Sequence, residues 1–152
     1  MSPSPSRSAA KTDRARSAAV VITCVSDTPD VEAVILGPDG VIEGAAAGAV
    51  VVDMSTISPS ATRRIASRLA EKGVNMIDAP VSGGQAGAEN GQLTVMVGGD
   101  PDVFDRARPV IDCYARAITL IGPVGSGQLA KMVNQICIAG IVQGLSEGLH
   151  FA

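Results

Sequence analysis

The chain has 152 residues, enough for one domain with a core of its own, and 46% of them are hydrophobic. Aromatic residues make up only 2%, so the core must be aliphatic, and the stacking platforms of single-stranded nucleic-acid binders are lacking. The formal net charge is −3 and no basic block occurs, which excludes an electrostatic surface for polyanions. We therefore expect a globular α/β chain with no nucleic-acid partner.

Residues 1–18 are rich in Ser, Arg, Ala and Pro and contain no glycine. Two interpretations are open, an organellar transit peptide or a disordered or foreign leader without function, and we adopt the second. No apolar run in the chain reaches the ~18 residues that a membrane span requires. We expect a cytoplasmic protein with no membrane partner.

The three cysteines, Cys24, Cys113 and Cys137, lie far apart and fit no metal-ligand spacing. An odd number of scattered cysteines in apolar surroundings is typical of reduced thiols in a cytosolic protein. We predict that all three are buried in the core and that no metal is bound.

From residue 19 onward, apolar runs of strand length alternate with segments of helix length. The predicted strands cover 19–25, 49–54, 74–79, 93–97 and 117–121. Four helices are predicted: one begins after Thr28, two cover 59–72 and 101–114, and the last runs from 125 to the end of the sequence. This alternation predicts βαβ units and a mostly parallel sheet that ends in a long helix.

Helix boundaries are indicated by capping residues. Thr28 and Ser58 each precede a proline, which predicts an N-cap followed by proline at the first helical position. Gly73 is predicted to end the second helix. In the last helix, the Gly125–Gly127 turn is predicted to carry a serine cap, and Asp78 is predicted to cap or turn the chain.

Ligands of parallel α/β sheets bind beyond the carboxyl ends of the strands. Four predicted strand ends lead into short polar or glycine-rich loops, at 25–26, 53–56, 81–84 and 122–127. We expect these loops to meet at one edge of the sheet and to form one site.

The loop at Ser82, Gly83 and Gly84 follows Pro80, which favours an extended path into it. Glycines allow backbone N–H groups to turn toward a ligand and to form a nest for a carboxylate. A tight turn without a ligand explains the same three residues equally well.

Lys131 and Asn134 share one face of the last helix, because they are three residues apart. A lysine on a helix is usually a solvated surface residue. The apolar, glycine-flanked surroundings of Lys131 favour another interpretation, in which burial lowers the pKa and the amine exchanges protons near neutral pH. His150, the only histidine, is interpreted as structural or facing solvent.

Two long motifs resemble the β-hydroxyacid dehydrogenase family, which includes 3-hydroxyisobutyrate dehydrogenase and tartronate semialdehyde reductase. They are Asp78-Ala79-Pro80-Val81-Ser82-Gly83-Gly84 and the run from Gly122 to Gln135. The resemblance covers about residues 19–152. It assigns Lys131 as the catalytic lysine, Ser82, Gly83, Gly84 and Asn134 to the substrate, and Val25, Ser26 and Thr56 to the nicotinamide side of the cofactor.

The resemblance implies hydride transfer between NAD or NADP and a short 3-hydroxy acid or semialdehyde, with the lysine as general acid/base, and a homo-oligomeric parent protein. The chain departs from the family pattern in having no Gly-x-Gly-x-x-Gly turn before these motifs. We therefore expect a leader over 1–18, a partial Rossmann-like NAD(P)-binding domain over 19–124, and the start of the helix toward an absent helical domain over 125–152. The alternative is a non-catalytic remnant with at most weak ligand binding.

Overall fold

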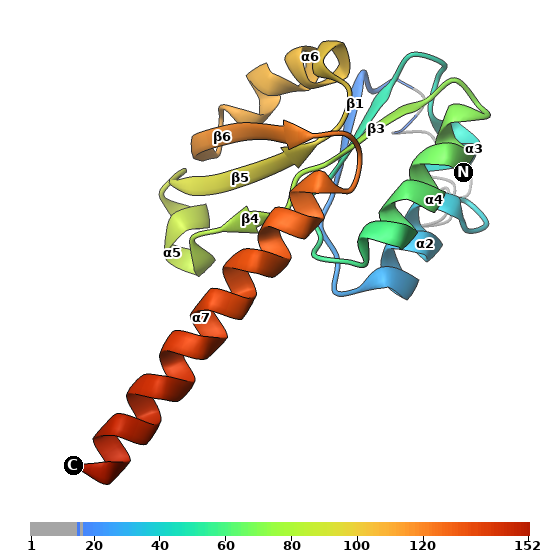
Figure 1. Ribbon diagram of the computed structural model, residues 1–152. Helices are drawn as coiled ribbons and strands as arrows, with labels where there is room; N and C mark the ends of the chain where they lie inside the picture. Colours follow the sequence, from blue (N-terminus) through green and yellow to red (C-terminus); the bar gives the residue numbers. More distant parts are fainter. Residues whose placement is uncertain (1–14, 16) are drawn as a thin grey trace, which may run out of the picture.

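The computed structural model describes Ala15 and residues 17–152. Most of the predicted leader therefore lies outside the described residues. The described part is an α/β domain from which one long helix projects (Figure 1).

The sheet consists of two groups of strands that run in opposite directions. In the first group, β1 (Val20–Thr23), β2 (Val50–Asp53) and β3 (Asn75–Asp78) are parallel. In the second, β5 (Leu93–Gly98) and β6 (Ala115–Gly122) are parallel to each other. The short β4 (Val81–Ser82) pairs antiparallel with β5 and therefore runs in the direction of the first group. β3 and β5 meet at one antiparallel pair, Asp78 and Gly98. The prediction of a mostly parallel sheet is confirmed, and the carboxyl ends of both groups meet at this pair.

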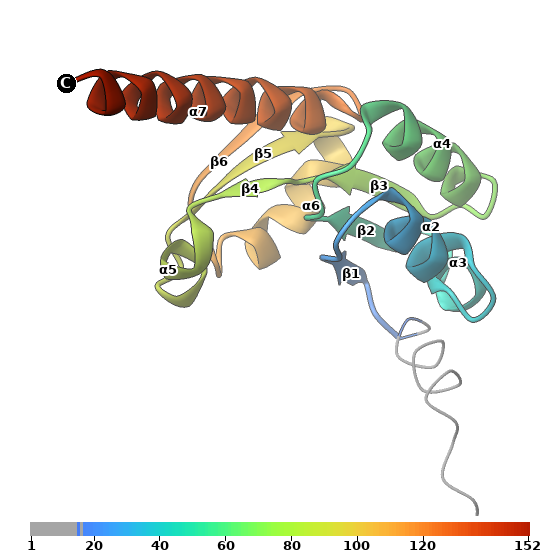
Figure 2. The same cartoon turned by 90° about the horizontal axis from the view of Figure 1, so that it is seen from below.

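Helices cover both faces of the sheet (Figure 2). One face carries α2 (Thr28–Leu36), α3 (Val41–Gly44) and α4 (Pro59–Ala70), and the other carries α6 (Pro101–Ile111). The short α5 (Gly84–Glu89) lies in the stretch predicted to be a glycine-rich loop, and α7 (Ser126–Phe151) is the predicted long last helix.

The alternation of side chains along buried strands divides the core in two. In β2, Val51 packs with the cluster under α2 and α4, whereas Val50 and Val52 pack with the cluster under α6. Met76 and Ile77 of β3 divide in the same way. A strand that is buried on both faces has a continuous run of apolar residues, and this is why these strands could be predicted from the sequence.

The helix caps differ in detail from the prediction. The N-cap of α2 is Asp27, whose carboxylate accepts from the Asp30 N–H at 3.3 Å, and Thr28 is already the first helical residue. Ser58 is the N-cap residue of α4, but its hydroxyl contacts that of Ser60 at 2.8 Å and makes no capping bond. Gly73 adopts φ +72° after α4 and allows the chain to turn into β3.

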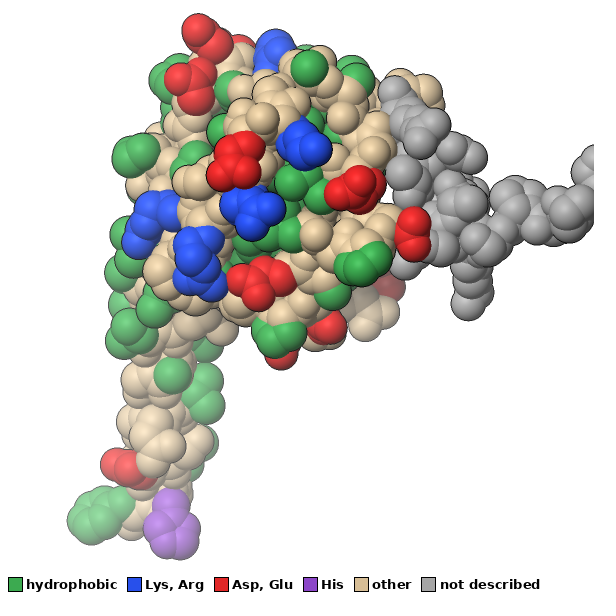
Figure 3. Space-filling model, turned by 90° about the vertical axis from the view of Figure 1, so that its right-hand side faces the viewer, with side chains coloured by type: hydrophobic (Ala, Val, Ile, Leu, Met, Phe, Trp, Pro, Cys, Tyr) green, Lys and Arg blue, Asp and Glu red, His purple; other side chains and the backbone are tan. Residues whose placement is uncertain are grey.

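The prediction of buried cysteines is wrong: all three are exposed free thiols. Cys24 follows the last residue of β1, Cys113 follows α6, and Cys137 lies on the projecting part of α7. Figure 3 shows hydrophobic side chains along this projecting part and the exposed His150 near its end, as expected for a histidine facing solvent. Apolar neighbours in the sequence did not imply burial, because the helix around Cys137 leaves the domain.

Candidate active site

The first turn of α7 is held by the carboxylate of Asp78. Its Oδ1 accepts from the Gly125 N–H at 2.6 Å, and its Oδ2 accepts from the Gln128 N–H at 2.9 Å. The predicted serine cap is wrong, because the N-cap residue is Gly125 at φ +91° and no side chain of α7 caps the helix. Of the two roles predicted for Asp78, capping or turning the chain, the first is present: Asp78 binds Gly125, the N-cap residue of α7, 47 positions further along the chain.

Gln128 joins α7 to the loop between β2 and α4. Its side chain is fully buried, with Nε2 donating to the Ser55 carbonyl at 2.7 Å and Oε1 accepting from the Ile57 N–H at 3.1 Å. These two bonds flank Thr56, a predicted cofactor contact. No local sequence pattern indicates this role, because both partners of the Gln128 side chain are more than 70 residues away.

The course of α7 brings Lys131 and Asn134 toward the predicted substrate loop. Gly127 lies against Gly98 and Met96 of β5, and α7 then runs antiparallel to β5 (Figures 1 and 2). Seven residues of helix cover about 10 Å. Four residues of strand, from Gly98 to Thr94, cover about 13 Å. Thr94 pairs with Ser82, so α7 passes the level of Ser82 shortly after Asn134.

Lys131 is half-buried, and this burial lowers the pKa of its ammonium below the usual 10.5. Asn134, also half-buried, donates from Nδ2 to the Gln135 side chain at 3.2 Å. The predicted lowering of the lysine pKa by burial is thus present. An amine that loses its proton more easily than a surface lysine is suited to proton transfer.

The predicted substrate loop has the backbone conformation of an open, glycine-dependent turn. Ser82 ends β4 and is half-buried, whereas Gly83 and Gly84 are exposed and adopt φ +136° and +59°. A side chain at Gly83 would be strained and would approach Leu93 within 3.1 Å. The two glycines therefore present backbone toward solvent beside Ser82.

The predicted cofactor contacts lie at the carboxyl ends of β1 and β2. The Val25 N–H donates to the Ser55 hydroxyl at 2.9 Å, which ties the two loops together, while Ser26 and Thr56 are exposed. These loops therefore lie side by side. Two of the four loops expected at one edge are thus adjacent, and that all four form one site stays a prediction.

A buried polar row underlies these loops. Thr23 donates to Asp53 Oδ1 at 2.9 Å, and Asp53 is in register with Asp78 on the neighbouring strand. Asp53 Oδ2 has no hydrogen-bond partner. Burial is the main cause that raises the pKa of Asp53 and also that of Asp78, where the two N–H donors of α7 oppose the effect.

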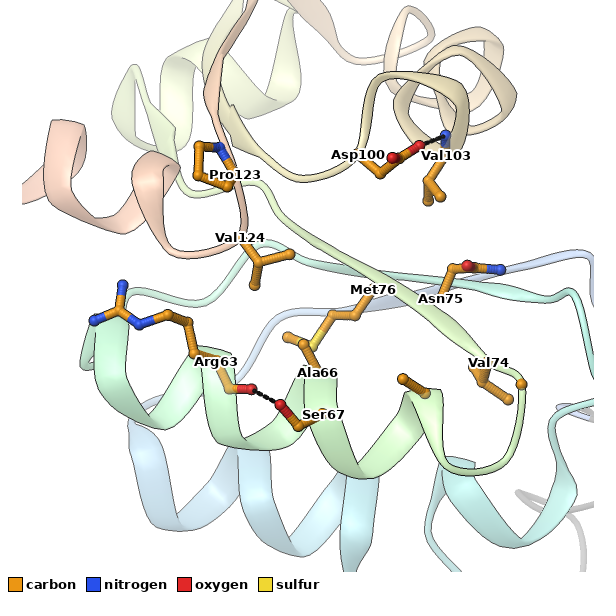
Figure 4. Close-up of a pocket in the computed structure, with 12 residues that line it drawn as sticks. Arg63, Ala66, Ser67, Val74, Asn75, Met76, Asp100, Val103, Pro123 and Val124 are labelled. Atoms are coloured by element: carbon orange, nitrogen blue, oxygen red, sulfur yellow. Dashed lines mark hydrogen bonds between the residues drawn. The ribbon is translucent and has the colours of Figure 1, made fainter.

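A hollow of about 560 Å³ lies elsewhere, between α4, the first half of β3 and the start of α6 (Figure 4). Arg63, Met76, Asp100 and Val124 are among its lining residues, and none of the predicted site residues is. We therefore do not assign it to the candidate site. Within residues 17–152 no cluster of metal-ligating side chains is found, and no helix, α7 included, has the combined length and apolarity of a membrane span.

A sheet covered by helices on both faces, with loops joined at the carboxyl ends of its strands, defines a Rossmann-like dinucleotide-binding domain. Comparison with known families agrees, since residues 5–122 match the NAD-binding domain of 6-phosphogluconate dehydrogenase. The chain belongs to this family. The match begins within the predicted leader, whose boundary at residue 18 stays a prediction.

Related proteins are oxidoreductases. The chain is 56% identical to an uncharacterized oxidoreductase of Shewanella frigidimarina, over 92% of the chain and 48% of the relative. It is 44% identical to 2-hydroxy-3-oxopropionate reductase of Escherichia coli, over 88% of the chain and 46% of the relative. The chain thus spans about half the length of these curated relatives.

A solved structure supports the same relationship. The 3-hydroxyisobutyrate dehydrogenase of Mycobacterium tuberculosis, determined with L-serine, superimposes with a TM-score of 0.81 at 33% sequence identity. The match covers 93% of this chain and 50% of that protein. The resemblance to the β-hydroxyacid dehydrogenases is therefore confirmed at the level of family and fold.

Proposed function

We propose that this chain carries the catalytic centre of an NAD- or NADP-dependent oxidoreductase that acts on a short 3-hydroxy acid or semialdehyde. The observation that carries the proposal is the course of α7 over β5, which brings the half-buried Lys131 toward the level of the Ser82–Gly84 loop. The named activities of the Escherichia coli and Mycobacterium tuberculosis relatives support the substrate class.

Ser82, Gly83 and Gly84 would bind the substrate carboxylate. Gly83 and Gly84 are exposed residues at positive φ, a conformation that allows backbone N–H groups to turn toward a ligand, and the Ser82 hydroxyl adds a donor beside them. Such a backbone nest suits an anion and needs no charged side chain. The acid would thus be held at the end of β4, with its hydroxyl carbon directed toward α7.

Lys131 would move the proton and Asn134 would orient the reacting oxygen. In the oxidation direction, the substrate hydroxyl gives its proton to the neutral amine of Lys131 while its carbinol carbon loses a hydride, and a semialdehyde is formed. In reduction, the Lys131 ammonium returns the proton to the carbonyl oxygen. The nicotinamide cofactor, when bound, accepts or supplies the hydride.

Val25, Ser26 and Thr56 would face the nicotinamide side of the cofactor. The joined loops at the ends of β1 and β2 fit this role, since the Val25–Ser55 bond and the Gln128 bonds fix Thr56 from both sides. For the pyrophosphate, the sequence offers no Gly-x-Gly-x-x-Gly turn. The alternative of a non-catalytic remnant rests on that observation.

Cofactor binding distinguishes the two hypotheses, the oxidoreductase and the non-catalytic remnant. The purified chain is titrated with NADH and with NADPH, and nucleotide fluorescence is recorded. Saturable binding tighter than about 1 mM, roughly −4 kcal/mol, supports the proposal. A folded sample that binds neither nucleotide supports the remnant.

If the cofactor binds, activity is assayed with 3-hydroxyisobutyrate and with tartronate semialdehyde. Lys131→Ala should lower kcat by about 10² to 10⁴, the usual contribution of a positioned proton donor or acceptor. The matched control is Lys72→Ala, because Lys72 is an exposed lysine after α4. The lowered pKa of Lys131 predicts that the oxidation rate rises with pH through a midpoint below 10.5.

A further inference from the structure

α7 is attached to the domain almost entirely by its first turn. Of its 26 residues only Gly127 and Gln128 are buried. From Val133 onward every residue of the helix except the half-buried Asn134 is exposed. The direction of the helix, and with it the place of Lys131, is therefore set by contacts within one turn of Gly127.

The first of these contacts is the Asp78 carboxylate, with both oxygens bound to α7 backbone N–H groups. Two glycines allow it to come this close. A Cβ atom at Gly98 would lie 2.5 Å from Asp78 Oδ1, and one at Gly127 would lie 2.9 Å from Oδ2 and 2.3 Å from the Met96 carbonyl. Strand and helix backbones thus meet around the carboxylate with no room for a side chain.

The second contact is the Gln128 side chain, which binds the backbone on both sides of Thr56. Asp78 fixes the start of α7 over β3 and β5, and Gln128 fixes its rotation against the loop after β2. Two anchors on different strands leave a helix little freedom to tilt or to turn about its axis. Lys131 follows Gln128 by three residues, slightly less than one helical turn.

We propose that Asp78 and Gln128 are positioning residues, which hold Lys131 against β5 and toward the substrate loop without touching the substrate themselves. The inference rests on the proposed function for the role of Lys131. The position of Lys131 can be tested without any catalytic activity. The positioning role and the proposed function can therefore be contradicted independently of each other.

The test compares two buried aspartates of neighbouring strands. Asp78→Asn replaces one of the two acceptor oxygens by an NH₂ group, which cannot accept from the α7 backbone. Asp53→Asn makes the same change at the residue in register with Asp78, whose recorded bonds are to Thr23 and Ser55 and not to α7. Both variants lose a buried carboxylate, and only the first loses a contact to the helix.

The readout is the pKa of Lys131, measured by NMR from the ¹³Cε shift in the 152-residue chain. Since burial lowers this pKa, displacement of α7 in Asp78→Asn should raise it toward 10.5, and Asp53→Asn should leave it unchanged. Loss of a negative charge alone acts in the opposite direction, because a nearby anion stabilises the ammonium. A rise therefore reports a change of position.

Gln128→Leu is a second variant, in case Asp78→Asn does not fold. It keeps the Asp78 cap and removes only the second anchor. Its control is Gln143→Leu, on the exposed part of the same helix and about three turns away from Lys131. Gln128→Leu should also raise the pKa of Lys131 and speed hydrogen exchange of the α7 amides at 128–131 by about tenfold. A Lys131 pKa that stays at its wild-type value in folded Asp78→Asn or in Gln128→Leu overturns the proposal.

Discussion

The first turn of α7 and the rest of the same helix are opposite environments. In the first turn, glycine backbone touches a strand and a buried glutamine bonds two loop residues. Beyond it, a Cβ atom at Gly140, Gly144 or Gly148 would have no neighbouring atom of the domain within 4 Å. Ile136, Ile141 and Leu149 are about 70% exposed. Residue type alone therefore does not distinguish the part of α7 that is anchored to the domain from the part that is exposed.

The largest difference in unfolding free energy is expected when glycine is replaced by alanine at two positions of this helix, Gly127 and Gly140. In Gly127→Ala the new Cβ would lie 2.3 Å from the Met96 carbonyl, so backbone must shift, and we expect a loss of about 3 kcal/mol. Gly140→Ala meets no atom and should gain about 0.5–1 kcal/mol through helix propensity. Urea unfolding followed by circular dichroism measures both. Effects of the same sign would contradict the comparison.

Two glutamines of α7 provide the next contrast. Gln128→Leu leaves the Ile57 N–H and the Ser55 carbonyl buried without a partner and should cost about 2–3 kcal/mol. Gln143 is exposed and bonds only Glu147 of its own helix, so Gln143→Leu should change stability by less than about 0.5 kcal/mol. The same unfolding experiment applies. An equal cost at both positions would show that Gln128 is not an anchor.

The pH dependence of stability sharpens the role of the buried carboxylates. Burial raises the pKa of Asp53 above its usual 3.8, so the folded state binds this proton more tightly than the unfolded state. Its stabilising contribution is therefore present below about pH 4 and is lost as the pH rises through the folded value. Asp53→Asn should make the decline of the unfolding free energy above about pH 4 shallower. An unchanged slope would mean that Asp53 does not titrate in this range.

The smallest effect is expected on the exposed apolar surface of α7. Ile136→Ser is a large chemical change at a side chain that is 70% exposed, and it should alter stability by less than about 0.5 kcal/mol. Ile65→Val removes only one methylene from the fully buried core under α4 and should cost about 1 kcal/mol. If the order of the two costs is reversed, the projecting part of α7 is covered in solution.

Local patterns predicted what depends on local sequence. Continuous apolar runs located the strands, and the proline after Ser58 located the start of α4, because both signals lie within a few residues. Lys131 and Asn134 were placed on one helix face by spacing alone. The family resemblance then supplied their proposed roles, which no spacing rule gives.

The contacts that place the site could not be predicted in this way. The Asp78 cap and the Gln128 bonds join residues 47 to 73 positions apart, and the partners are backbone groups that carry no sequence signature. β4 and α5 were missed because seven residues from 81 to 87 include three glycines, which lower the propensity for both strand and helix. The exposure of Cys137 could not be predicted either, because it depends on the direction in which α7 leaves the domain.

The length of α7 beyond its anchor gives the helix the mechanics of a lever. Lys131 lies about 6 Å along the axis from Gly127, whereas Phe151 lies about 36 Å away. A tilt of about 10° at the first turn would move the far end by about 6 Å and the lysine by only about 1 Å. Small displacements of Lys131 are therefore magnified about sixfold at Phe151. Conversely, a force applied near Phe151 acts on the first turn with a large mechanical advantage.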